Sequence, residues 1–267
     1  MSNVATSHLQ ADIDRLSPWF HNLHLPGGVQ TLPNHPYYGD FPARKWNTIA
    51  PYFPEDMSGM TALDIGCNAG FYTLEMAKRG AHVTALDIDD GYLNQARWAA
   101  GVMGLENRIT FRKAPVYHLS RETDRYDVVL FLGVFYHLRY PQLALDIVSR
   151  LARRLFVFQT LTYPDDATVE IPEDVSIDDR ERLAQPGWPK MAYIERYLAG
   201  DPTNWWVPND AAVMGMLRKA GMKIVATPGE EMYVCEPDPE APVDAERWGW
   251  DEYLAATGQG NKIGANV

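Results

Sequence analysis

The chain has 267 residues, 46% of them hydrophobic, and carries 24 basic against 35 acidic residues, for a formal net charge of −11. This apolar content excludes disorder as the default and is enough for a large buried core. The negative charge argues against a nucleic-acid partner, because proteins that neutralise many phosphates are usually basic. Only Cys67 and Cys235 are present, which indicates neither a disulfide framework nor a metal site.

The N-terminal stretch MSNVATSHLQADIDRL lacks a basic region followed by an apolar run, so it does not read as a signal peptide. No segment approaches the roughly 20 apolar residues of a membrane span. We therefore expect a cytoplasmic protein without a membrane partner. Residues 1–50 are rich in Pro, His and aromatic residues, and we interpret them as an ordered, loop-like cap. Its histidines at 21, 24 and 35 match no recognised metal-ligand spacing, and we expect no metal.

From residue 61 the sequence alternates between strand-like and helix-like segments. Strands are expected at 61–65, 81–88, 108–114, 127–133 and 154–161, and helices at 71–79, 92–103 and 141–153. After an irregular, Pro-rich stretch, Asn209 is a candidate N-cap for a helix at 210–220, and 222–236 predicts a closing hairpin. The sum is an α/β fold, a doubly wound, Rossmann-like seven-stranded sheet whose last strand is antiparallel.

This alternation divides the chain into five expected parts. They are an N-terminal aromatic cap (1–50), a Rossmann-like core (51–161), an acidic insertion that forms a substrate lid (162–206), the closing helix and strands of the core (207–235) and a C-terminal tail (236–267).

The stretch LDIGCNAG joins the first strand to its helix and places Asp64, Gly66, Asn68 and Gly70 in a D-x-G-x-N-x-G pattern. Glycine lets a ligand approach the backbone, and asparagine tolerates the left-handed region. Phe71 stands where the dinucleotide fingerprint needs its third glycine, which argues against a nicotinamide cofactor. The turn therefore predicts a different ligand held against the backbone.

Asp87 ends the second strand, 21 residues after Gly66. An acidic side chain at this place hydrogen-bonds a ribose diol in Rossmann-type sites. The alternatives are a solvated carboxylate at the strand end and a cap for the following helix. Together with the glycine turn, Asp87 favours ribose binding.

At this point the chain resembles the class I S-adenosylmethionine (SAM) methyltransferases. The resemblance covers about residues 60–235 and rests on LDIGCNAG, VTALDID and YDVVLFLGVFYHL. A closer resemblance is to the tRNA wobble-uridine carboxymethyltransferase branch. It rests on the pair Lys45-Trp46, on a GVxYHxRxP run at Gly133–Pro141 and on the segment TNWWVPNDAAV.

The resemblance implies that SAM is the cofactor and that Gly66 lies against its methionine portion. Asp87, Ile88 and Asp89 would lie at the ribose and adenine edge, with Lys45 reaching in from the cap. Further residues would line the adenine and the methyl group: Val116, Tyr117, Leu132 and Tyr136.

One departure from the carboxymethyl branch concerns the carboxylate of carboxy-SAM. That branch holds it with a lysine in a Lys-Gly-Pro stretch and with a late arginine. The corresponding residues here are Leu25-Pro26-Gly27, and the C-terminal GNKIGANV has no clear counterpart for the arginine. Two missing cations predict that ordinary SAM is the donor.

His137 and Tyr136 follow the fourth strand, where open α/β sheets bind ligands. His137 has the pKa range of a general base at neutral pH, although it could instead be a structural histidine that hydrogen-bonds the insertion. Tyr136 is expected to line the methyl region, because a phenol with a pKa near 10 is a poor base. We assign both to catalysis, with His137 as the base.

Acceptor binding is expected between the cap and the insertion. Cations at Arg44 and Arg139 would suit an acidic acceptor, and aromatic residues would pack it, although cap-to-core packing explains any single one equally well. The aromatic candidates are Tyr37, Tyr38, Trp46, Trp205 and Trp206. We expect the two insertion tryptophans to meet the Tyr37–Trp46 segment over the SAM methyl group.

Three functions remain open at this stage. The leading one is methyl transfer to an oxygen or nitrogen of a small-molecule metabolite. The alternatives are a tRNA wobble-uridine (carboxy)methyltransferase, against which the net charge of −11 and the acidic insertion stand, and a non-catalytic SAM-binding module. The acceptor, its nucleophilic atom, the pathway and the oligomeric state are not determined by the sequence.

Overall fold

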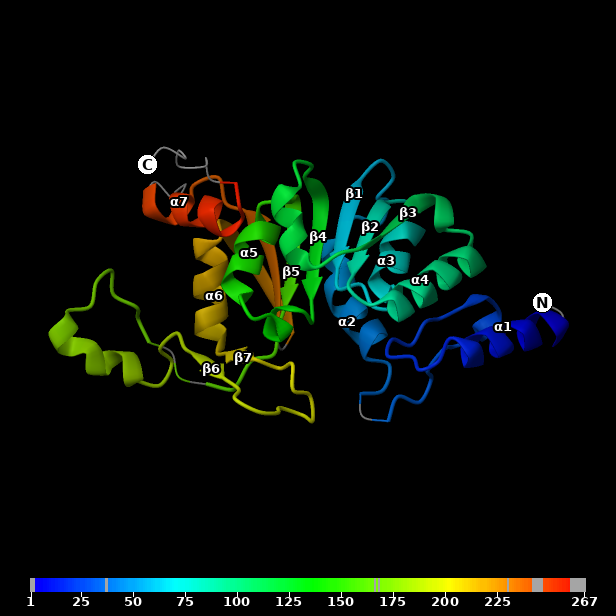
Figure 1. Cartoon of the computed structure of the whole chain (residues 1–267), viewed down its shortest axis with the longest axis horizontal. Coiled ribbons are helices and arrows are strands. Elements are labelled where there is room, and N and C mark those ends of the chain that lie inside the picture. The colour runs from blue at the N-terminus through cyan, green and yellow to red at the C-terminus, as the bar shows by residue number, and fades with distance from the viewer. Residues whose placement is uncertain are drawn as a thin grey trace, which may run out of the picture. The chain divides into compact units, whose positions relative to one another are not determined.

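The protein was analysed as a computed structural model, shown in Figure 1. The structure describes residues 3–36, 38–165, 167, 169–229, 231–241 and 247–259. Its strands are β1 (Thr61–Ile65), β2 (His82–Asp87), β3 (Ile109–Lys113), β4 (Tyr126–Leu132), β5 (Ala152–Gln159), β6 (Met191–Tyr193), β7 (Trp206–Pro208), β8 (Met222–Gly229) and β9 (Met232–Pro237). Its α-helices are α1 (Asn3–Arg15), α2 (Phe41–Ile49), α3 (Phe71–Lys78), α4 (Asp90–Met103), α5 (Pro141–Ser149), α6 (Asp210–Lys219) and α7 (Arg247–Ala256).

Seven strands form one hydrogen-bonded sheet in the order β3-β2-β1-β4-β5-β9-β8. The β1–β4 strands pair in parallel, and β9, the last strand in sequence, is antiparallel to both β5 and β8. This arrangement confirms the expected doubly wound α/β fold and the closing hairpin. The chain divides into two compact units, residues 1–116 with 126–131 (unit 1) and residues 117–125 with 132–267 (unit 2). The five expected parts stay a prediction.

Unit 1 contains the parallel strands and the helices that follow them, α3 and α4 (Figure 1). Ala62 and Leu63, adjacent residues of β1 that point to opposite faces of the sheet, are both fully buried, as expected for a strand covered on two faces. The β1–β2 register pairs Asp64 with Ala85 and Ile65 with Leu86. The carboxyl ends of β1 and β2 therefore lie side by side, with the LDIGCNAG turn following the first and Asp87 ending the second.

The N-terminal segment is more regular than expected. We predicted a loop-like cap, but α1 and α2 lie within residues 1–50. Contacts with α4 hold α1 in place, because Trp98 Nε1 donates to Asp12 and Gln95 Nε2 donates to the carbonyls of Leu16 and Pro18. An isolated helix of this length is marginal in water, so tertiary contacts of this kind decide whether it forms.

Unit 2 is built around aromatic side chains of β5 and its surroundings. Phe135 and Phe158 are fully buried and meet edge to face with ring centroids 5.3 Å apart. The helix α5 begins at Pro141 as expected, but it ends at Ser149 and not at 153, because β5 already starts at Ala152. Asn209 caps α6 by accepting the backbone N–H of Ala212, as predicted.

The segment expected as an insertion contains a short two-stranded sheet, β6 with β7, and a 3₁₀ helix, η6 (Ile177–Ala184). None of the η6 residues is buried. The following tail also packs within unit 2, since the Arg150 guanidinium lies 4.0 Å from the ring centroid of Trp250 on α7. No described helix is long and apolar enough to cross a membrane.

Candidate active site

The predicted residues divide between the two units. In unit 1 the turn after β1 reverses direction through three left-handed residues, Gly66 (φ 71°), Asn68 (φ 51°) and Gly70 (φ 85°). Asn68 thus adopts the left-handed backbone conformation that asparagine was predicted to tolerate. A Cβ added to Gly70 would lie 3.0 Å from Ala96 Cβ, so glycine also permits the close approach of α3 to α4.

Asp87 fastens this turn to the end of β2. Its Oδ2 accepts the backbone N–H of Asn68 at 2.9 Å, and its Oδ1 accepts that of Asp89 at 2.9 Å. Only 8% of the residue is exposed, and burial raises the pKa of its carboxyl, while the backbone N–H donors act in the opposite direction. Each carboxylate oxygen keeps a second lone pair, which is what a ribose diol requires.

The neighbours of Asp87 have distinct roles. Asp89 is the N-cap of α4, and its Oδ1 accepts the backbone N–H of Tyr92 at 3.1 Å. The helix-cap alternative considered for Asp87 therefore belongs to Asp89. Ile88 is 68% exposed although it stands between two polar anchors. An exposed apolar side chain beside a polar site gives a surface on which a planar base can pack.

Asp64 lies under the turn and is 2% exposed. The Thr73 hydroxyl donates to its Oδ2 at 2.5 Å. Burial raises the pKa of this carboxyl to about 6, with the charge of Asp87 adding to the effect and the Thr73 hydrogen bond opposing it. Asp64 thus stabilises the turn from within unit 1.

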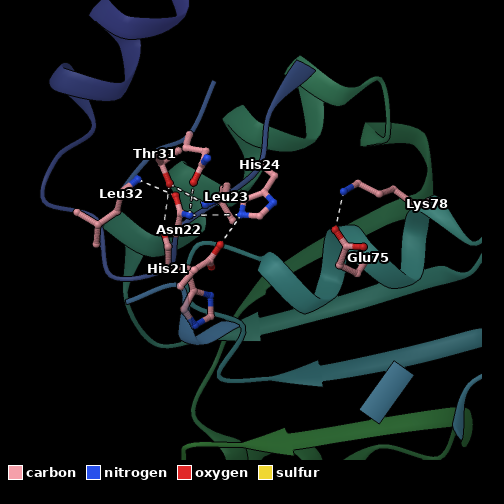
Figure 2. A network of polar contacts seen from close by, with 10 residues as sticks. His21, Asn22, Leu23, His24, Thr31, Leu32, Glu75 and Lys78 are labelled. Carbon is pink, nitrogen blue, oxygen red and sulfur yellow. Dashed lines mark hydrogen bonds and ion pairs between the residues drawn. The ribbon is translucent and has the colours of Figure 1, made fainter. Parts of the chain in front are cut away.

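The cap presents a polar network next to α3 (Figure 2). His24 Nε2 lies 2.6 Å from Asp40 Oδ2, and the amide of Asn22 lies 3.3 Å from the same nitrogen. Below it, the His21 ring is buried between Phe41 and Tyr72, at centroid distances of 5.6 and 5.8 Å. His21 Nδ1 has no hydrogen-bond partner among the described residues.

Three other cap candidates, Arg44, Lys45 and Trp46, lie on α2. Arg44 is exposed, and the Lys45 ammonium lies 5.8 Å from the Phe41 ring. Trp46 is buried against Phe53 and covered by Arg79, 4.9 Å from its ring, so packing alone accounts for it. Tyr38 is half exposed, and Tyr37 lies outside the described residues.

Val116 is buried and is the last residue of the first segment of unit 1, whereas Tyr117 is the first residue of unit 2. The Tyr117 hydroxyl accepts the backbone N–H of Tyr140 at 3.2 Å. Leu132, the last residue of β4, is partly buried. Their assignment to the adenine and methyl regions stays a prediction.

Unit 2 brings together four of the predicted residues: Tyr136, His137, Arg139 and Trp205. The backbone N–H of Trp205 donates to the Tyr136 carbonyl at 2.8 Å, and the Arg139 guanidinium lies 4.1 Å from the Trp205 ring. The Tyr136 and His137 rings are 4.3 Å apart. Trp206 belongs to β7, packs 5.0 Å from Tyr193, and keeps an unpartnered buried Nε1 among the described residues.

Two residues that we did not predict complete this cluster. His137 Nδ1 lies 2.9 Å from Thr203 Oγ1, and the Thr203 hydroxyl donates to Asp201 at 2.7 Å. The sequence signal was the D-P-T triplet before Trp205, which is typical of a tight turn but does not indicate its partner. Among the described residues, no group of three His, Cys, Asp or Glu side chains is placed to hold a metal ion.

The comparisons with known proteins agree with this geometry. A family model described as a methyltransferase domain matches residues 62–155. The tRNA U34 carboxymethyltransferase of Idiomarina loihiensis is 28% identical over 188 residues, which are 68% of this chain and 51% of the relative. The ubiquinone biosynthesis O-methyltransferase of Aeromonas salmonicida is 36% identical over 102 residues, 37% of this chain and 42% of the relative. This chain spans about half the length of the first of these relatives.

Among solved structures, the N-terminal domain of EvdMO1 with SAH bound is similar with a TM-score of 0.57 and 20% identity, over 86% of this chain and 94% of that one. It shows the shared fold. The domain match at residues 62–155, the sheet order and the turn support a methyltransferase domain of the class I SAM-dependent type, with SAM as its cofactor. The predicted class, enzyme type and cofactor are confirmed. The expectation that nucleic acid is not a partner finds no support, because several relatives are named as tRNA-modifying enzymes.

Proposed function

We propose that this chain transfers a methyl group from ordinary SAM to a wobble uridine of tRNA. The observation that carries the proposal is the set of curated relatives named tRNA U34 carboxymethyltransferase. The match to the first of them covers 68% of this chain and so extends beyond the general methyltransferase region at 62–155. We therefore propose tRNA as the acceptor, in place of the small-molecule metabolite that we first expected.

Ordinary SAM, and not carboxy-SAM, is favoured by the tip of the cap. Pro26 begins the single turn Pro26–Gly28, closed by a hydrogen bond from Leu25 N to the Val29 carbonyl at 2.8 Å. Proline offers no cation to a carboxylate there. His24, close by in the sequence, is already paired with Asp40. A carboxylate buried without a partner costs several kcal/mol, on the order of the desolvation of one ion.

The residues of unit 1 fit SAM. Asp87 can accept the ribose hydroxyls, Ile88 can pack on the adenine, and the left-handed turn at Gly66 leaves room for the methionine portion. When bound, SAM supplies a methyl group whose bond to the sulfonium breaks with the electron pair staying on sulfur, while a lone pair of the acceptor forms the new bond to carbon. The protein contributes alignment and a dry site, which can be worth roughly 7–11 kcal/mol.

His137 is the proposed base that takes the proton from the acceptor. Burial lowers its pKa, while Asp201 and the Thr203 carbonyl act in the opposite direction. The imidazole is therefore neutral at pH 7 and able to accept a proton. A positioned base of this kind contributes about 10²–10⁴-fold to the rate.

A small-molecule acceptor is the second candidate, and one observation favours it. Residues 162–206 contain ten acidic and four basic residues, and η6 is wholly unburied. An acidic surface repels phosphates and suits a neutral or cationic acceptor. A relative with a methyltransferase region similar to that of this chain is named a ubiquinone biosynthesis O-methyltransferase.

Incubation with methyl-labelled SAM tests the two candidates directly. Bulk tRNA from cells in which this gene is deleted and a metabolite extract from the same cells are offered in separate reactions. We expect label in tRNA that survives digestion to nucleosides and is found in a modified uridine. Label confined to the metabolite extract would replace this proposal with the second candidate. Asp87→Asn serves as the variant with a weakened cofactor site.

A further inference from the structure

Three polar side chains of unit 2 form a chain of hydrogen bonds between η5 (Phe135–His137) and the end of the insertion. His137 Nδ1 lies 2.9 Å from Thr203 Oγ1 and 3.3 Å from the Thr203 carbonyl. The Thr203 hydroxyl and its backbone N–H both donate to Asp201 Oδ1, each at 2.7 Å. The second carboxylate oxygen of Asp201 lies 3.9 Å from His137 Nδ1.

The direction of each hydrogen bond follows from which groups can donate. Asp201 is ionised at neutral pH: burial acts to raise the pKa of its carboxyl, but the Thr203 donors and His137 outweigh burial and lower it. An ionised carboxylate only accepts, so the Thr203 hydroxyl gives its single proton to Asp201. The hydroxyl oxygen then accepts from His137, and the Thr203 carbonyl can only accept as well. Both contacts require a hydrogen on Nδ1.

A neutral imidazole carries one hydrogen, so a hydrogen on Nδ1 leaves the lone pair on Nε2. Nε2 has no hydrogen-bond partner within the part of the chain that the structure describes. Asp201 Oδ2 lies 3.9 Å from Nδ1, and the Tyr136 ring centroid lies 4.3 Å from that of His137. Arg139, two residues along, is directed onto Trp205.

We propose that Thr203 and Asp201 are positioning residues that hold His137 in the tautomer whose Nε2 accepts the proton of the methyl acceptor. This inference rests on the proposed function. As the acceptor's lone pair bonds to the methyl carbon and the carbon–sulfur electron pair leaves with sulfur, the acceptor's O–H or N–H proton passes to Nε2. The imidazolium that results is stabilised by the carboxylate of Asp201. The same logic applies to the orienting carboxylate of a Ser-His-Asp triad.

Substitutions at the two positions separate tautomer control from packing. Thr203→Val keeps the shape and removes the hydroxyl, and Thr203→Ser restores it. Asp201→Asn presents an amide that can donate to the Thr203 hydroxyl, which then donates to Nδ1 and favours the wrong tautomer. Thr110→Val on β3 and Asp179→Asn on η6, both at exposed positions, are the matched controls.

Two readouts are combined. Nitrogen-15 NMR of the imidazole, with His137 assigned from the spectrum of His137→Gln, reports the tautomer in the absence of any acceptor. Turnover is measured between pH 5.5 and 8.5, together with the dissociation constant of S-adenosylhomocysteine. Thermal melts confirm that each variant is folded.

We expect the Nδ1–H tautomer in the wild type and a smaller population of it in Asp201→Asn and Thr203→Val, in which the Thr203 backbone carbonyl is the remaining acceptor for Nδ1–H. Turnover should fall about 10–100-fold in these variants, a large part of what a general base contributes, with cofactor affinity unchanged and with Thr203→Ser restoring most of it. An Nε2–H tautomer in the wild type, or a Thr203→Val enzyme with wild-type turnover and pH profile, would overturn the inference. A wild-type protein that methylates no acceptor would instead contradict the proposed function. The NMR result alone would then decide whether Thr203 and Asp201 control the tautomer of His137.

Discussion

The backbone N–H of Asn68 donates to Asp87 Oδ2 at 2.9 Å, which ties the turn after β1 to the carboxylate that ends β2. Asn68 and Asp87 are 19 positions apart in sequence but are joined directly by this hydrogen bond. Replacing Asp87 is therefore expected to have two effects. It removes the proposed hydrogen-bond partner of the ribose, and it removes the hydrogen bond that holds the turn at Asn68.

Replacing Asp87 by Ala should weaken binding of SAM and of S-adenosylhomocysteine by about 1–3 kcal/mol, since a charged acceptor is lost in a nearly buried place. Isothermal titration calorimetry measures the change. Asp90→Ala is the matched control, because this neighbouring carboxylate is exposed on α4 and bonds Lys113. Equal affinity in the wild type and Asp87→Ala would show that the ribose lies elsewhere.

The left-handed backbone at Asn68 predicts an unusual ranking of substitutions. Asn68→Gly and Asn68→Ala both lose the side-chain oxygen that accepts the Ala69 N–H at 2.8 Å. Only alanine also meets the steric cost of positive φ, about 1–2 kcal/mol. Urea unfolding should therefore find the glycine variant more stable than the alanine variant by roughly that amount. The opposite order would mean that the turn does not keep φ near 51° in solution.

The uncharged tip at Pro26 predicts donor choice. Ordinary SAM should bind better than carboxy-SAM in a direct competition followed by mass spectrometry of the bound ligand. Pro26→Lys should narrow the difference by supplying a cation for the added carboxylate, and Pro36→Lys, further along the cap, controls for charge alone. Preferential binding of carboxy-SAM by the wild type would restore carboxymethyl transfer.

His21 predicts a specific acid sensitivity. Burial lowers the pKa of its imidazole to about 3, with the positive charge of Lys45 adding to the effect, whereas the unfolded chain takes up a proton near pH 6.5. Below pH 6.5 the unfolded state therefore binds one more proton, and native stability falls by about 1.4 kcal/mol per pH unit until about pH 3.

His21→Phe keeps a ring between Phe41 and Tyr72 and removes this titration. The free energy of unfolding should fall less steeply with acid in the variant, so that the difference from the wild type grows by about 2 kcal/mol between pH 6.5 and 5. Chemical denaturation at several pH values measures it. Parallel pH curves for the two proteins would show that His21 is solvated or charged in the native state.

The local signals of the sequence predicted unit 1 well. The bounds of β1 are those expected, because the run TALDI stops at a glycine turn, and in unit 2 the predicted N-cap at Asn209 is present. The predicted end of α5 was wrong by four residues. Only two residues separate α5 from β5, and both elements are largely apolar here, so the sequence pattern does not show where the helix ends and the buried strand begins.

Features that depend on distant contacts could not be predicted in the same way. The helix α1 is held by Trp98 and Gln95 of α4, more than 75 residues away in sequence, and its own sequence is weakly apolar. The chain of hydrogen bonds from His137 through Thr203 to Asp201 also joins distant residues, since 66 positions separate His137 from Thr203. No spacing rule connects such pairs, so only the fold brings them together.

The proposed methylation of tRNA by this chain can be tested on the nucleosides of cellular tRNA. Cells that lack the gene would be compared with the same cells carrying the wild-type gene or Asp87→Asn, with each tRNA pool digested and analysed by mass spectrometry. We predict a uridine derivative with a methyl group in place of one hydrogen, which is lost on deletion, restored by the wild type and not restored by Asp87→Asn. Identical nucleoside profiles in all three strains would contradict it.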